Sequence, residues 1–247
     1  MLAEQTIDKL EALGLAAMAA GLSEQLSAPG TYDGLSFADR LGLLVDKEAD
    51  ARDSRRLATR LKAAKLRHPA SIEDIDFRAP RGLDRSVVLS LAQGPWVREH
   101  HNVLVTGPTG CGKSFLACAL ANSAVRLGHT ALYVRTPRLL DDLALGRADG
   151  RYARLLSQLA RVGVLVLDDF LLTPASVEAC RDLLEVVEDR AGVRSTVVAS
   201  QVPVDKWHPS MADPTLADAV VDRLFQASHR IVMKGASMRK RQPAPSP

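Results

Sequence analysis

The fold is decided by the stretch Gly107-Pro108-Thr109-Gly110-Cys111-Gly112-Lys113-Ser114. It completes the pattern G-x-x-x-x-G-K-S, in which glycines let the backbone curl so that several N–H groups point at one phosphate group. An apolar run at 103–105 predicts a buried strand directly before it, and residues 115–125 have helical periodicity directly after it. The start of that helix adds the positive end of its dipole. We therefore predict a phosphate-binding loop formed by these eight residues.

Two side chains of the loop and two acids further along predict the chemistry of this site. Lys113 is expected to reach the β- and γ-phosphates of ATP, and the Ser114 hydroxyl to bind Mg²⁺. Asp168 and Asp169 follow an apolar strand at 162–167, and Asp168 stands 55 residues after Lys113. That spacing leaves room for one intervening strand with its helices, so Asp168 is expected near the loop, holding the magnesium through water. Asp169 is positioned to polarise the attacking water.

The remaining pattern from residue 101 onward alternates apolar strands with helices. Further strands are predicted at 131–134 and 196–199. Helices are predicted at 139–145, 152–159, 177–187 and 216–225. Strands that alternate with helices in this way are typical of an α/β fold with a parallel sheet covered by helices on both faces.

The first 68 residues predict a small helical domain. Apolar residues recur at helical spacing up to a stop at Pro29-Gly30, and Ser36-Phe37-Ala38-Asp39 matches a capping box that opens a second helix. That helix is expected to end at His68-Pro69, because proline disfavours helical geometry in the residue before it. We predict a helical domain at 1–68, a connector at 69–100, an ATPase domain at 101–241 and a flexible tail at 242–247.

Charge is segregated along the 247 residues although the formal total is only +3. Residues 1–50 hold nine acids and three bases, whereas residues 51–68 hold seven bases and one acid. The last 25 residues hold six bases and no acid. Aromatic residues make up 4% of the chain, which weighs against a single-strand binder that stacks bases on rings. Three cysteines without CxxC spacing, no signal peptide and no membrane-spanning run predict a cytoplasmic protein.

Beyond these patterns, residues from about 7 to 241 resemble the IstB/DnaC-like branch of AAA+ ATPases, and most closely IstB, the helper ATPase of insertion-sequence transposition. The phosphate loop is shared by many NTPases, but the order of the other motifs is far more specific. They are Leu35-Ser36-Phe37, Arg55-Arg56-Leu57, Leu83-Asp84-Arg85, Asn102-Val103-Leu104, Ala148-Asp149-Gly150-Arg151, Leu167-Asp168-Asp169-Phe170, Ser200-Gln201-Val202-Pro203-Val204, Asp222-Arg223-Leu224, His229-Arg230-Ile231 and Lys234-Gly235-Ala236-Ser237-Met238-Arg239-Lys240.

The resemblance implies an AAA+ core without a full C-terminal lid domain, in a homo-oligomer that carries ATP at its subunit interfaces. It implies binding to duplex DNA and recruitment or stimulation of a partner transposase. Gln201 fills the polar sensor position, and Arg223 matches the arginine that reaches the neighbouring subunit's ATP. Arg239 is a candidate second sensor or a basic contact. Asp169 stands where AAA+ proteins usually have glutamate, which predicts slow, switch-like hydrolysis, and Leu171 stands where the family usually has glycine.

A basic row on the second predicted helix is the candidate DNA contact. It consists of Arg52, Arg55, Arg56, Arg60, Lys62, Lys65 and Arg67. Bases that meet phosphates release counterions, so such a row binds DNA without sequence preference and more weakly as salt rises. A solvated face that pairs with the acids of residues 1–50 is the alternative for a charge run.

Two other classes of function compete with the transposition helper. A DnaC-like loader of a replicative helicase shares the family resemblance and would hold a ring helicase through its N-terminal region. A small-molecule P-loop kinase would need a recognisable substrate lid, whereas this sequence has arginines typical of oligomeric ATPases.

Overall fold

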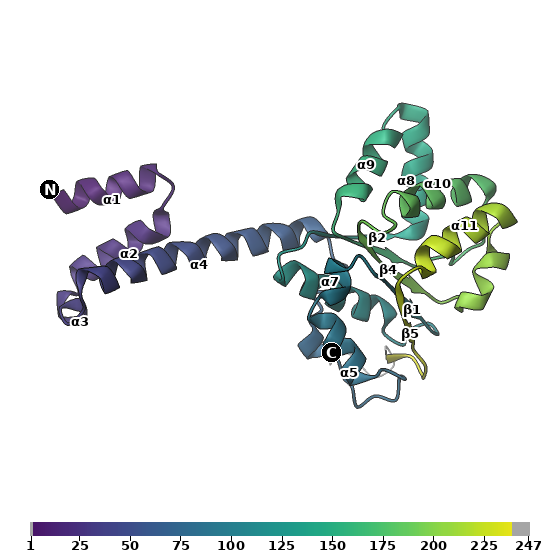
Figure 1. Cartoon of the computed structure of the whole chain (residues 1–247), viewed down its shortest axis with the longest axis horizontal. Helices are drawn as coiled ribbons and strands as arrows, with labels where there is room; N and C mark the ends of the chain where they lie inside the picture. The colour runs from purple at the N-terminus through teal and green to yellow at the C-terminus, as the bar shows by residue number, and fades with distance from the viewer. Residues whose placement is uncertain (1, 239–247) are drawn as a thin grey trace, which may run out of the picture. The chain divides into compact units, whose positions relative to one another are not determined.

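The computed structural model describes residues 2–238. Contacts within it divide the chain into two compact units, Met1–Thr59 and Arg60–Pro247. Figure 1 shows the first unit as helices only and the second as a sheet with helices around it. No helix among the described residues combines the length and apolarity needed to cross a membrane.

The first unit is helical, as the sequence predicts. It contains α1 (Leu2–Ala12), α2 (Ala16–Ser27), α3 (Pro29–Tyr32) and the first part of α4 (Phe37–Ala64). The predicted capping box is present, because Asp39 N–H donates to Ser36 Oγ at 3.2 Å and Ser36 N–H to the Asp39 carboxylate at 3.3 Å. The Glu48 carboxylate accepts the backbone N–H groups of Ala17 and Met18 at 2.9 and 3.2 Å. It thereby satisfies donors in the first turn of α2, which helices otherwise leave unpaired.

Helix α4 ends earlier than the sequence predicts. Its last residue is Ala64, and Lys65 follows with φ 49°, in the left-handed region. A residue in this conformation commonly terminates a helix. The predicted end at His68-Pro69 is therefore wrong by a few residues, because the turn is made by a lysine whose identity gives no termination signal.

The second unit contains a five-stranded sheet in which all neighbouring strands are parallel. Its order is β2 (Ala131–Arg135), β3 (Val164–Asp168), β4 (Ser195–Ser200), β1 (Asn102–Thr106) and β5 (Ser228–Val232). The four predicted strands are confirmed. The sequence reading missed β5, which is an edge strand with only one buried residue and therefore has no apolar run.

Helices cover both faces of this sheet (Figure 1). They are η1 (Ile72–Asp74), α5 (Arg85–Ala92), α6 (Pro95–Arg98), α7 (Lys113–Arg126), α8 (Thr136–Asp149), α9 (Tyr152–Arg161), α10 (Val177–Glu188), η2 (Val204–Lys206), η3 (His208–Ser210) and α11 (Pro214–Phe225). Leu104 and Leu165 pack in one buried cluster with Leu183 of α10 and Leu224 of α11. Because side chains alternate along a strand, their neighbours face the opposite side, where α7 contacts the sheet.

The carboxyl ends of the strands position the candidate site. The phosphate loop follows β1, Asp169 follows β3 and Gln201 follows β4. Strand β4 lies between β1 and β3, so the three segments meet along one edge of the sheet. Ligands of open α/β sheets bind at this edge.

Candidate nucleotide-binding site

The phosphate loop connects β1 to α7 through glycines that close contacts require. Gly110 and Gly112 have φ 83° and 103°, in the region that favours glycine. A Cβ on Gly112 would lie 2.8 Å from Nη1 of Arg81, and one on Gly110 would collide with the Ser237 side chain. The backbone therefore curls tightly in front of α7, as phosphate binding requires.

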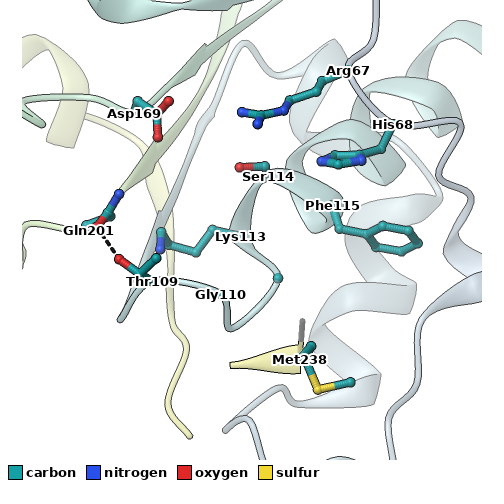
Figure 2. Close-up of a pocket in the computed structure, with 11 residues that line it drawn as sticks. Arg67, His68, Thr109, Gly110, Lys113, Ser114, Phe115, Asp169, Gln201 and Met238 are labelled. Carbon is teal, nitrogen blue, oxygen red and sulfur yellow. Dashed lines mark hydrogen bonds between the residues drawn. The ribbon is translucent and has the colours of Figure 1, made fainter. Parts of the chain in front are cut away.

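Lys113 and Ser114 stand at the N-terminus of α7, which begins at Lys113. Lys113 Nζ donates to the Pro108 carbonyl at 2.9 Å, within the loop itself. A cavity of about 230 Å³ lies over the loop. It is lined by Arg67, His68, Thr109, Gly110, Gly112, Lys113, Ser114, Phe115, Asp169, Gln201 and Met238 (Figure 2). The ammonium group and the helix N-terminus together favour an anionic ligand here.

Asp168 ends β3 as a buried carboxylate. Its Oδ2 accepts the Tyr133 hydroxyl at 2.6 Å. Burial and this hydrogen bond raise the pKa of Tyr133, so the phenol stays a donor. The carboxylate of Asp168 and the hydroxyl of Ser114 are oxygen donors, the type that Mg²⁺ prefers. These two residues therefore fit the predicted metal ligands.

Asp169 lines the cavity with its backbone in the left-handed region, at φ 55°. Its Oδ2 accepts Nε of Arg135, the last residue of β2, at 2.8 Å. Leu171, two residues later, also has positive φ, at 52°. The family's usual glycine would adopt this angle without strain. Leu171 makes the same turn and stays buried.

Gln201 also lines the cavity and contacts the phosphate loop. Its side-chain oxygen accepts the Thr109 hydroxyl (Figure 2). This contact joins the end of β4 to the loop that follows β1. The predicted sensor residue thus lies where it would contact both the loop and a ligand on it.

The other predicted ATPase residues lie elsewhere. Arg223, on α11, is absent from the cavity lining and pairs with Glu188 at 2.5 Å. That pairing raises the pKa of Arg223. Arg239 lies outside the described residues. Cys111 is fully buried within the loop, so it contributes its backbone and not its thiol.

The predicted DNA-binding row divides into paired and unpaired bases. Arg52 and Arg55 contact Glu48 at 2.9 and 3.1 Å, and Arg56 contacts Asp53 at 3.3 Å. Within the described part of the chain, no ion pair joins Arg60, Lys62 or Lys65 to an acid. The seventh base, Arg67, lies in the phosphate-loop cavity.

Sequence reasoning missed three further residues around the loop. Tyr133 and Arg135 stand near the end of β2, at the same sheet edge as Asp168 and Asp169. Their position near the end of a predicted parallel strand indicates that they lie at the ligand-binding edge of the sheet. Arg81 is buried behind the loop and donates to the Cys111 carbonyl at 3.4 Å. Nothing in its sequence context indicated that contact.

Comparison with known proteins supports the ATP-binding assignment. A family model described as IstB-like ATP binding protein matches residues 8–246. The insertion sequence ATP-binding protein y4pL of Sinorhizobium fredii is 50% identical over 242 residues, which span 98% of each chain. An ATP-binding protein of insertion sequence IS1162 in Pseudomonas fluorescens is 48% identical over 204 residues, 82% of this chain and 88% of that one.

Solved structures match the AAA+ fold. The crystal structure of DnaI superposes with a TM-score of 0.58 and 20% identity, over 67% of this chain and 91% of that one. That of the DnaC helicase loader gives a TM-score of 0.53 and 20% identity, over 71% and 99%. Identities this low show the fold alone. The family match and the identity to these relatives show the family: the chain belongs to the IstB-like ATP binding proteins.

Proposed function

We propose that this chain is an ATP-dependent helper of insertion-sequence transposition that assembles on duplex DNA and recruits or stimulates a partner transposase. One observation carries the proposal. The phosphate loop, Asp169 and Gln201 line a single cavity, in a chain whose relatives are insertion sequence ATP-binding proteins. ATP, bound with Mg²⁺, is the proposed cofactor.

The residues of the cavity have distinct proposed roles. The loop amides and Lys113 bind the phosphates, and Ser114 and Asp168 hold Mg²⁺. When bound, Mg²⁺ neutralises charge on the phosphates. Asp169 orients the attacking water, and Gln201 contacts the terminal phosphate from the end of β4. The ion pair of Asp169 Oδ2 with Arg135 at 2.8 Å draws negative charge away from the carboxylate that would orient the water, which supports slow, switch-like hydrolysis.

Arg223 supports the oligomer. It lies outside its own subunit's cavity lining, on the surface helix α11, with its side chain 34% exposed. We propose that it reaches the ATP of a neighbouring subunit and stabilises charge on the transferring phosphoryl group. To do so, the Arg223 guanidinium must leave its ion pair with Glu188 and bind the phosphate.

The bases on and just after α4 supply the proposed DNA contact. Arg60, Lys62 and Lys65 are available to phosphates, whereas Arg52, Arg55 and Arg56 would exchange the carboxylates of Glu48 and Asp53 for DNA. Because these internal ion pairs must be broken first, Arg52, Arg55 and Arg56 contribute less to the free energy of DNA binding. We expect the first group to dominate affinity at moderate salt.

The test is assembly of the full chain on duplex DNA, followed by analytical ultracentrifugation with and without ATP. Wild type should form large complexes only with ATP. Lys113→Ala should form none, and the matched control Lys206→Ala, an exposed lysine on η2, should behave as wild type. Asp169→Asn should assemble but hydrolyse ATP at least about 10-fold more slowly.

Three outcomes would contradict parts of the proposal. ATP-independent assembly would remove the nucleotide from the mechanism. Turnover by Asp169→Asn equal to wild type would end the water-orienting role of this carboxylate. Binding to a replicative helicase without ATP-dependent assembly on duplex DNA would favour a helicase loader.

A further inference from the structure

Arg67 lies in the nucleotide cavity, away from the role that its place in a basic row predicts. Its side chain lines the cavity together with Ser114 and Asp169. Figure 2 shows the guanidinium above Ser114, pointing toward Asp169. The side chain is 42% exposed and its Nη1 stands 3.9 Å from Asp168 Oδ2. This separation is an ion pair but is too long for a hydrogen bond.

The groups around Arg67 leave donors of its guanidinium available to a ligand. Arg67 is a permanent cation, and contact with the Tyr133 hydroxyl, followed by the charges of Asp168 and Asp169, raises its pKa further. Asp168 already accepts Tyr133, and Asp169 already accepts Arg135. Among the described residues, Arg67 forms no hydrogen bond with either carboxylate, and its Nη1 stands 3.9 Å from Asp168 Oδ2. The guanidinium is held close to two acids by charge while its fork points into the cavity.

Binding of a nucleotide with its metal ion in the cavity would change the charges around Arg67. A metal ion at Asp168 would place a second positive charge where Arg67 now interacts. The guanidinium then needs a new anionic partner within reach. Phosphate oxygens suit it, because the guanidinium fork binds them in a bidentate manner. The end of the nucleotide nearest Ser114 and the two acids is the terminal phosphate, since Lys113 and Ser114 bind the β- and γ-phosphates.

We propose that Arg67 binds the terminal phosphate of ATP and makes this site discriminate ATP from ADP. The proposal rests on the ATP binding proposed above and adds a residue to that same site. It assigns Arg67 to nucleotide recognition within its own subunit, and it removes Arg67 from the DNA-contacting row.

The position of Arg67 in the chain gives this contact a second consequence. Arg67 follows the last residue of α4 by three positions, and Lys65 between them makes the left-handed turn that ends the helix. If the Arg67 side chain moves when nucleotide binds, the movement therefore affects the short turn that joins it to the end of α4, next to Arg60 and Lys62. Those two bases belong to the proposed DNA contact.

The experiment compares nucleotide affinities of the full chain by calorimetry, using a non-hydrolysable ATP analogue and ADP, each with Mg²⁺. Arg67→Ala should weaken the analogue about 10- to 100-fold, the loss expected for a hydrogen-bonded charged contact, and ADP less than about threefold. Arg67→Lys should retain part of the discrimination, because it keeps the charge without the fork. Arg154→Ala, an exposed base on α9, is the matched control and should bind both nucleotides as wild type does.

Binding of these variants and of Lys62→Ala to duplex DNA without nucleotide separates nucleotide recognition from DNA contact. Arg67→Ala should bind DNA as wild type does, whereas Lys62→Ala should bind more weakly. Equal losses for the analogue and ADP, or no loss for either, would overturn the proposal, as would a DNA defect as large as that of Lys62→Ala. Failure of wild type to bind the analogue would instead refute ATP binding itself.

Discussion

Replacing Arg190 with methionine tests how a buried cation holds one end of the sheet together. Arg190 follows α10, is 1% exposed and has no acid as a hydrogen-bond partner. Its guanidinium donates to the carbonyls of Leu159, Val162 and Ser195 at 2.5, 2.8 and 2.5 Å, and to the Thr196 hydroxyl at 3.1 Å. It thereby joins the end of α9 to the start of β4. Burial lowers the pKa of Arg190 to about 9.

The magnitude follows from these four hydrogen bonds. Bonds to a charged group contribute about 1.5–3 kcal/mol each, which gives roughly 6–12 kcal/mol for the set. Methionine removes them but also removes the several kcal/mol that burying a cation costs. Three carbonyls lose their donor. We therefore expect Arg190→Met to lower the free energy of unfolding by about 3–5 kcal/mol, because three carbonyls left without a donor cost about 1–3 kcal/mol each and the removal of the buried charge offsets part of that loss.

Urea unfolding followed by tryptophan fluorescence measures this change, since Trp96 and Trp207 are both buried in the second unit. Arg194→Met is the matched control, because Arg194 is exposed four residues later and should cost less than about 0.5 kcal/mol. Arg190→Lys should fall between the two. A loss below about 1 kcal/mol for Arg190→Met would refute the reasoning, because the burial cost of the cation would then cancel its hydrogen bonds.

Two more predictions concern Glu48 and Arg223. The Arg52 contact lowers the pKa of Glu48, so its stabilising effect is present above the ordinary glutamate range and is lost as pH falls through the lowered pKa. Glu48→Gln should therefore melt at a lower temperature than wild type at neutral pH by circular dichroism, with a gap that closes in acid; Asp46→Asn is the exposed control, and a gap independent of pH would contradict the reasoning. Mixtures of inactive Arg223→Ala and Lys113→Ala proteins should recover ATPase activity, because a mixed interface can place the intact Arg223 of one subunit against the intact Lys113 of the other. No recovery at any ratio, with both proteins still assembling, would count against a role for Arg223 in the neighbouring site.

The central elements could be predicted because their sequence constraints are strong. Strands β1 and β3 are buried along their whole length, so they require apolar runs. The phosphate loop requires glycines for its close contacts. Strand β5 has one neighbour and polar residues, and Lys65 ends α4 through backbone conformation alone. The sequence places Arg67 in the basic row because charge along a helix is visible in sequence, whereas the turn that directs its side chain into the cavity is not.

The segment from Asp169 to Leu171 holds free energy in its backbone. Two non-glycine residues with positive φ flank Phe170, whose N–H donates to Ala199 at 3.0 Å and whose carbonyl accepts Ser200 Oγ at 2.7 Å. Such conformations cost on the order of 1–3 kcal/mol each. A ligand present at about 100 times its dissociation constant contributes about 2.7 kcal/mol, which is comparable. The two hydrogen bonds of Phe170 hold this strained turn at its centre, and the strain is of the same order as the free energy that a ligand at that concentration supplies.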